Sequence, residues 1–285
     1  MRTTVFRPER VTIVAVLNAT PDSFSDGGRF VQGDRAVNVA AVVDAAARLV
    51  EAGAHVLDIG GESTRPGSSR VPVAEEIART SPAVEALAKR FDLPISIDTR
   101  KAPVAEVALD AGADIVNDIS GLRHDPTLAE LAGRRHATLI LGHLRGSPGG
   151  MQDEVHFDDV LGEVAAELAA SVALARDAGV ADEQLCVDPG IGFGKHLEHN
   201  LALLARVGEL RQRLELPVLV GPSRKAFLGA LTGEPVERRD EATAAACAVA
   251  VFAGADAVRV HDVAGAARAV AIGRALRDAA AEGTA

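Results

Sequence analysis

The chain has 285 residues, of which 48% are hydrophobic and 25% are charged, a composition typical of a folded protein with one large or two ordinary domains. Its formal net charge of −10, with no basic stripe, argues against a protein that binds nucleic acid. No apolar run approaches the ~18 residues of a membrane span, and there is no signal-peptide core. Cys186 and Cys247 show neither metal-ligand spacing nor a disulfide framework. We therefore expect a soluble protein of the reducing cytoplasm without a membrane partner.

Short apolar runs alternate along the chain with longer amphipathic segments. Short apolar runs bounded by turn residues are typical of strands that are buried on both faces. Eight such strands are predicted, at residues 12–17, 55–59, 94–97, 114–116, 137–141, 184–187, 217–220 and 257–260. Ala-rich segments between them predict helices, for example at residues 34–52, 103–111, 158–178 and 200–214.

Glycines and prolines mark where the predicted helices end. Gly53, Gly112, Gly179 and Gly254 each follow a helical segment and precede a strand, as expected of a left-handed helix C-cap. Residues 233–240 contain Pro235 and two arginines, and they predict a split or extension of the seventh helical segment.

Eight strand–helix units without a linker predict an α/β protein with a single (β/α)8 TIM barrel. We assign the whole chain, residues 1–285, to this one domain, with a core from about residue 11 to residue 281. A doubly wound open sheet is the structural alternative. It would usually have fewer strands or a second domain, and no Gly-x-Gly-x-x-Gly follows the first strand.

Polar residues follow almost every predicted strand. In a barrel, the carboxyl ends of the strands form one face, where the chemistry of these proteins takes place. The residues in question are Asn18, Asp58, Asp98, Asn117, His143, Asp188, Ser223, Lys225, Arg259 and His261. We therefore predict that the site lies at the mouth formed by these strand ends.

Asp98, Asn117, Asp188 and Lys225 could converge at this mouth from four strands. Two carboxylates, an amide and an ammonium could perform acid–base chemistry, coordinate a hard metal ion, or bind a flat heterocycle with adjacent donors and acceptors. A satisfied polar layer that caps the barrel core is the structural alternative.

Arg259 and His261 lie two residues apart on the last strand, so their side chains point the same way. Together with Asn18 on the neighbouring first strand, they predict a clamp for phosphate or diphosphate. The glycine-rich residues 188–195 lack the spacing of a nucleotide-binding P-loop, and their glycines predict close backbone approach to a flat ligand with Phe193 as one wall.

Loops and a helix start complete the predicted mouth. Residues 18–29 and 60–67 are rich in Gly, Pro and small polar residues, which predicts long mobile loops after the first and second strands. Pro222 ends the seventh strand, and Ser223 is predicted to cap a helix that begins at Arg224.

Seven segments of the chain resemble the signatures of the dihydropteroate synthase family. They are Asn18-Ala-Thr-Pro-Asp-Ser-Phe-Ser-Asp-Gly-Gly28, Asp58-Ile-Gly-Gly-Glu-Ser-Thr-Arg-Pro-Gly67, and residues 96–99, 117–121, 188–195, 223–225 and 259–262. These segments run in order along nearly the whole chain, which makes a coincidental match at all of them untenable.

The resemblance implies a transferase of folate biosynthesis, the target of sulfonamides in this family. It would condense (7,8-dihydropterin-6-yl)methyl diphosphate with para-aminobenzoate to give dihydropteroate and diphosphate. It also implies Mg²⁺ as a cofactor, small molecules as partners and, together with apolar late helices, a homodimer.

The resemblance also implies roles for individual residues. Asp98, Asn117, Asp188 and Lys225 would hold the pterin, and Asn18, Arg259 and His261 would hold the diphosphate, with Mg²⁺ bound through Asn18. Thr64, Arg65 and Pro66 in the second loop, with Phe193 and Ser223, would border the aminobenzoate. Of these, Lys225, Asp98, Arg259 and His261 would be catalytic.

Two other functions are compatible with parts of this pattern. A pterin-binding methyltransferase would be expected to retain the Asp and Asn contacts to the pterin, but not the diphosphate clamp or Ser223-Arg224-Lys225. A non-catalytic pterin-binding paralogue would keep the barrel without the activity. Product formation from the two purified substrates separates all three.

Overall fold

The computed structural model describes residues 5–7, 9–19, 31–32, 36–63, 70–146 and 155–282. Eight parallel strands form one sheet in the order β8-β7-β6-β5-β4-β1-β10-β9, and a parallel bridge between Val187 and Val218 joins its two edges. The strands are β1 (Thr12–Asn18), β4 (Val56–Gly60), β5 (Ile95–Asp98), β6 (Ile115–Asp118), β7 (Thr138–Gly142), β8 (Leu185–Asp188), β9 (Leu219–Val220) and β10 (Ala257–Val260). The sheet is therefore the closed barrel that the sequence predicts.

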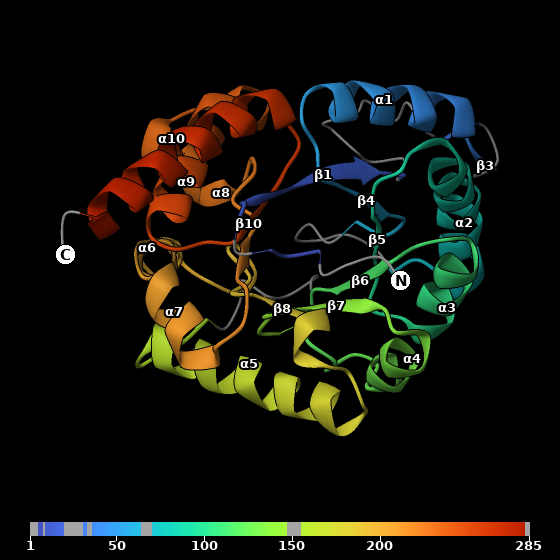
Figure 1. Cartoon of the computed structure of the whole chain (residues 1–285), viewed down its shortest axis with the longest axis horizontal. Coiled ribbons are helices and arrows are strands. Elements are labelled where there is room, and N and C mark those ends of the chain that lie inside the picture. The colour runs from blue at the N-terminus through green and yellow to red at the C-terminus, as the bar shows by residue number, and fades with distance from the viewer. Residues whose placement is uncertain are drawn as a thin grey trace.

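The helices form a ring around the strands (Figure 1). They are α1 (Val39–Glu51), α2 (Val73–Arg90), α3 (Ala102–Asp110), α4 (Thr127–Arg135), α5 (Val160–Asp177), α6 (Leu197–Ala205), α7 (Val207–Leu214), α8 (Ala226–Thr232), α9 (Asp240–Phe252) and α10 (Val263–Glu282). Two short 3-10 helices, η1 (Asp182–Gln184) and η2 (Val236–Arg238), and an antiparallel pair, β2 (Val31–Gln32) with β3 (Ala36–Val37), complete the described elements. No helix of the described residues is long and apolar enough to cross a membrane.

The predicted helix ends are confirmed at the glycines. Gly53, Gly112, Gly179 and Gly254 all have positive φ angles, between 88° and 118°, which glycine adopts without the steric cost of a Cβ. The seventh unit is split as expected, since η2 lies between α8 and α9.

One predicted helix is broken in the structure. Residues 200–214 form parts of α6 and α7, which meet at Arg206, where φ is −118°. Gly208, at the start of α7, lies so close to the end of α9 that a Cβ would be 2.6 Å from the Ala253 carbonyl oxygen. The break therefore accompanies a tertiary contact that a periodic apolar pattern does not contain.

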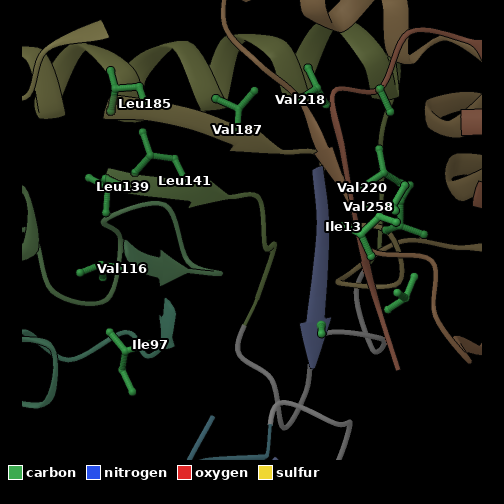
Figure 2. Packing of buried hydrophobic residues seen from close by; sticks show 14 of the residues in the cluster. Ile13, Ile97, Val116, Leu139, Leu141, Leu185, Val187, Val218, Val220 and Val258 are labelled. Atoms are coloured by element: carbon green, nitrogen blue, oxygen red, sulfur yellow. The ribbon is translucent and has the colours of Figure 1, made fainter. Parts of the chain in front are cut away.

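The strands separate two apolar compartments. The barrel interior is filled by alternate strand residues and closed at the amino end of the barrel by Val5 and Phe6; its strand members are Val14, Val56, Ile115, Ile140, Cys186, Leu219 and Ala257. The intervening residues, among them Leu139 and Leu141 on β7 and Leu185 and Val187 on β8, form the larger core between strands and helices (Figure 2). This division follows from the two-residue period of a strand.

Candidate functional site

The same two-residue period positions the site. On five strands, the residue two positions after an interior residue is polar and lies at the carboxyl end of the barrel. Val56 is followed in this way by Asp58, Ser96 by Asp98, Ile115 by Asn117, Cys186 by Asp188, and Ala257 by Arg259. The mouth is thus a polar layer next to the apolar interior. It contains the residues on these strands that the sequence predicts to bind a flat heterocycle or a diphosphate, namely Asp98, Asn117, Asp188 and Arg259.

Arg259 lies between two carboxylates in this layer. Its Nε donates to Asp58 Oδ2 at 2.6 Å, and its Nη2 donates to Asp98 Oδ2 at 2.7 Å. Asp58 is completely buried, and its Oδ1 has no hydrogen-bond partner among the described residues. Arg259 Nη1 also donates to no described residue. The guanidinium is therefore fixed from one side, with one nitrogen left over for a ligand.

The charges in this group perturb one another. Burial raises the pKa of Asp98 to about 7, the Arg259 guanidinium opposes the rise, and the carboxylate of Asp58 adds to it. Burial lowers the pKa of Arg259, but the Asp58 and Asp98 carboxylates outweigh it and leave that pKa above its ordinary value. Two acids share one cation here, which is an arrangement more typical of a functional site than of a structural ion pair.

Lys225 and Asp188 form the second part of the layer. Lys225 Nζ donates to the Ile191 carbonyl oxygen and lies 4.2 Å from the centroid of the Phe193 ring, a cation–π contact. Asp188 Oδ1 accepts a hydrogen bond from Gly190 N at 2.7 Å. Burial lowers the pKa of Lys225 to about 8, and the negative charge of Asp188 opposes this shift. Burial likewise raises the pKa of Asp188, opposed by Lys225.

Two asparagines complete the layer. Asn117 pairs in register with Asp98 on the adjacent strand, is 3% exposed, and its amide makes no hydrogen bond to a described residue. Asn18 Nδ2 lies 3.5 Å from His261 Nε2, across the β1–β10 boundary. With the amide oriented this way, Asn18 Oδ1 accepts no hydrogen bond from the part of the chain that the structure describes.

Ser223 does not cap a helix, so that prediction is wrong. Its Oγ lies 2.9 Å from His261 Nδ1 and accepts a hydrogen bond from His261 N at 3.2 Å. Arg224 has a φ of 57°, which is incompatible with a helical start, and its guanidinium bonds to Asp240. The helix α8 begins only at Ala226. Ser223 instead orients the imidazole of His261 at the mouth of the barrel.

Some predictions fall where the structure describes nothing. Thr64, Arg65 and Pro66 lie outside the described residues, as do residues 20–29 of the first predicted loop. Phe193 is described, and it packs on Ile119 and Leu144 beside Lys225.

The sequence reasoning missed two features of the site. It did not assign Asp58 a function, although the interior position of Val56 two residues earlier contains the necessary signal. It also missed Lys195, which is 3% exposed and bonds to the side chain of His143, because a lysine in a glycine-rich loop predicts only an exposed cation.

The chain matches the family of pterin binding enzymes over residues 14–261, and it belongs to that family. It is 47% identical to a dihydropteroate synthase of Synechocystis over 256 residues, covering 90% of this chain and 86% of that protein. Among solved structures it resembles Yersinia pestis dihydropteroate synthase in a sulfonamide drug complex, with a TM-score of 0.88, 41% identity and 95% coverage of both chains. It also resembles Xanthomonas albilineans dihydropteroate synthase with 4-aminobenzoic acid, with a TM-score of 0.84, 41% identity and 94% coverage of both.

These likenesses define a class and then a reaction. The class is the pterin-binding enzymes with a TIM barrel. Within it, the chain has the function of a dihydropteroate synthase, a transferase of folate biosynthesis that joins a pterinylmethyl group to para-aminobenzoate.

Proposed function

We propose that the polar layer at the barrel mouth binds the pterin of this reaction through Asp98, Asn117, Asp188 and Lys225. The observation that carries the proposal is that Asp98, Asn117 and Asp188 share the interior face of the strands, with Asp98 and Asn117 in register, and that Lys225 lies beside Asp188. A carboxylate accepts paired N–H bonds from the amidine-like edge of a pterin, and an ammonium donates to its ring carbonyl or nitrogen. The Asn117 amide, which bonds to no described residue, and the carboxylates of Asp98 and Asp188 match such a ligand.

The diphosphate binds at the neighbouring sector of the mouth. Asn18 and His261 are adjacent there, and Arg259 contributes positive charge through the nitrogen that its two carboxylates do not use. These donors are partly buried, where electrostatic interactions are stronger than in water, and they stabilise negative charge that develops on the leaving group. His261 is held in orientation by Ser223.

Mg²⁺ fits this sector through Asn18. No cluster of three His, Cys, Asp or Glu side chains that could hold a metal occurs among the described residues. The Asn18 amide oxygen is a hard ligand, and Mg²⁺ commonly takes one or two protein oxygens together with substrate phosphates and water. When bound, the ion would neutralise charge on the departing diphosphate. Its binding therefore depends on diphosphate as well as on Asn18.

The reaction itself requires little acid–base chemistry from the protein. The bond between the pterin methylene and the diphosphate oxygen breaks, the electron-rich dihydropterin supports the cation, and the amine nitrogen then bonds to the methylene and releases a proton. An aromatic amine is neutral near pH 7 and needs no strong base. Phe193 and Ser223, beside Lys225, border the position of the aminobenzoate, and this is the site at which we expect sulfonamides to compete.

We further propose a homodimer in the cytoplasm. Large apolar side chains on the adjacent helices α9 and α10 are half exposed or more: Val249, Phe252, Ile272 and Leu276. Several large exposed apolar side chains on two adjacent helices are typical of an interaction site, and a second copy of the chain would cover them. Ile272→Glu together with Leu276→Glu should convert the dimer to a monomer in sedimentation velocity. Both cysteines are free and buried, as expected in a reducing compartment.

The test of the proposed roles combines activity and metal binding. Dihydropteroate should form from the two purified substrates when Mg²⁺ is present, and Asn18→Ala should need more Mg²⁺ for half-maximal rate. Calorimetry should detect Mg²⁺ binding with diphosphate present and little without it. Tight Mg²⁺ binding to the bare protein would contradict the metal assignment.

A further inference from the structure

Lys195 is a buried cation that the roles above do not use. Only 3% of it is exposed, and its Nζ lies 2.8 Å from His143 Nδ1, 3.0 Å from the Phe193 carbonyl oxygen and 3.4 Å from the His143 carbonyl oxygen. His143, at the exit of β7, is completely buried. Lys195 thus connects the end of β7 to the turn that follows β8.

His143 and Glu167 form a chain of polar contacts that supports a positive charge on Lys195. His143 Nε2 lies 3.1 Å from Glu167 Oε2 on α5, and burial lowers the pKa of His143 to about 4. Hydrogen bonds from His143 and Arg145 hold the pKa of Glu167 at about 2, although partial burial opposes them. A neutral imidazole that donates from Nε2 to this carboxylate must accept at Nδ1. The lysine therefore faces three acceptors, which match the three protons of an ammonium.

Burial and the neighbouring charges both act on the pKa of Lys195. Burial lowers its pKa well below the ordinary value, and the positive charge of Lys225 acts in the same direction. The carboxylates of Asp188 and Glu167 oppose the shift. Since all three donor directions are occupied, we assign the charged form, because a neutral amine would leave one acceptor without a proton.

The turn that Lys195 holds carries the contacts to Lys225. Ile191 provides the carbonyl that accepts from Lys225, and Phe193 provides the ring beside it. The fit of the turn is tight, because a Cβ on Gly190 would collide with the His143 carbonyl and one on Gly192 would lie 2.8 Å from Lys225 Cδ. A small displacement of this turn therefore moves Lys225.

We propose that Lys195 is a positioning residue of the pterin site, whose ammonium joins the exit of β7 to the turn after β8 and so fixes the Ile191 carbonyl and the Phe193 ring against Lys225. Glu167 acts through His143 to keep the acceptor nitrogen directed at Lys195. This inference rests on the proposed pterin roles of Asp188 and Lys225.

The decisive variant is Lys195→Met, which keeps an unbranched apolar side chain out to the ε position and removes the ammonium group. It should fold, because Glu167 keeps its ion pairs with Arg145 and Arg123 and no buried carboxylate is left alone. We expect the KM for the pterin substrate to rise about 10- to 100-fold while kcat changes less than about threefold, as for a lost charge-assisted contact acting on ground-state binding. Lys89→Met, at an exposed lysine on α2, is the matched control and should behave as wild type.

Two comparisons make the test specific. Glu167→Gln should weaken pterin binding in the wild-type background and have no further effect in Lys195→Met, since one relay connects the two; additive effects would overturn the relay. Asp188→Asn is measured in parallel, with circular dichroism to verify folding. Weak binding by Asp188→Asn with normal binding by Lys195→Met would overturn the role of Lys195 alone. Normal binding by both would overturn the pterin site on which it rests.

Discussion

At the amino end of the barrel, His55, Asp114 and Asp256 each accept a hydrogen bond from a backbone N–H near the start of a neighbouring strand, at Ile13, Ile95 and Val218 respectively. At the carboxyl end, by contrast, charged side chains face one another, and one oxygen of Asp58 has no partner among the described residues. The first arrangement satisfies groups that the fold would otherwise bury unpaired. The second leaves hydrogen-bonding capacity that a ligand can use.

Buried polar groups at the two ends of the barrel thus serve different purposes, stability at the amino end and function at the carboxyl end. A buried polar group that completes a backbone hydrogen bond stabilises the fold. A buried charge whose pKa is shifted in the unfavourable direction, such as Asp98 or Lys225, costs stability and is retained for another reason. Removing a charge of the second kind should therefore reduce activity without reducing stability, and removing a group of the first kind should do the reverse. Arg259, whose charge is favoured by two neighbouring carboxylates, should affect both. Four predictions test this, from the largest expected effect on activity to none.

Arg259→Met should have the largest effect, because it leaves Asp58 and Asp98 facing each other without their cation. Breaking a buried charge cluster in this way costs about 3–5 kcal/mol of unfolding free energy, and we expect synthase activity to be lost. Urea denaturation and product formation measure both. Adding Asp58→Asn should recover part of the stability and none of the activity. Wild-type stability of Arg259→Met alone would contradict the role of Arg259 in compensating the two carboxylates.

Asp188→Asn should weaken pterin binding about 10- to 100-fold, the equivalent of one charge-assisted hydrogen bond of about 1.5–3 kcal/mol. The amide oxygen can still accept from Gly190 N, so the turn should stay intact. Because burial raises the pKa of Asp188, its charge is disfavoured in the fold, and the variant should be no less stable than wild type. Calorimetric titration with a pterin measures the binding, and thermal unfolding measures the stability. A loss of stability that accompanies the loss of binding would show that Asp188 also stabilises the fold.

The pH dependence of binding should report Lys225, whose pKa is lowered to about 8 by burial. Between pH 8 and the ordinary lysine value of about 10.4, the unfolded chain binds more protons than the folded one, so the contribution of this group to stability rises with pH in that window. Pterin affinity should change in the opposite direction and fall by up to about tenfold per pH unit above pH 8, as the ammonium is lost. The same decline in Lys225→Met would show that another group is responsible.

Asp256→Ala should have the smallest effect on catalysis. It removes the acceptor of Val218 N and the partner of Arg211, at the end of the barrel away from the mouth. A buried N–H without a partner costs about 1–3 kcal/mol, so the melting temperature should fall while kcat/KM at 25 °C stays at the wild-type value. A drop in kcat/KM for fully folded protein would mean that the two ends are coupled.

Most of the architecture was predictable, because strand and helix periods are local properties. The eight strands lie where apolar runs predict them, and the glycine C-caps hold at all four positions. The membership of Asp98, Asn117 and Asp188 in one layer follows from strand ends meeting at one face.

The remaining features depend on contacts that no local pattern contains. Asp58 and Arg259 are 201 residues apart and meet only because β1 lies between β4 and β10. The break at Arg206 accompanies packing of Gly208 on Ala253, and Ser223 faces His261 because β9 and β10 are neighbours. In each case tertiary geometry overrides the local signal.

The two cysteines lie one in each apolar compartment, Cys186 in the barrel interior and Cys247 on α9 in the outer core. Both are completely buried, and burial raises the pKa of Cys247 to about 12 and that of Cys186 well above its ordinary value. Neither thiol can react with an aqueous electrophile until its own compartment opens. The chain therefore contains two built-in probes of breathing motions: the labelling rate of Cys247 reports separation of the helical shell, that of Cys186 reports opening of the barrel, and a substrate that closes the mouth should slow the second more than the first.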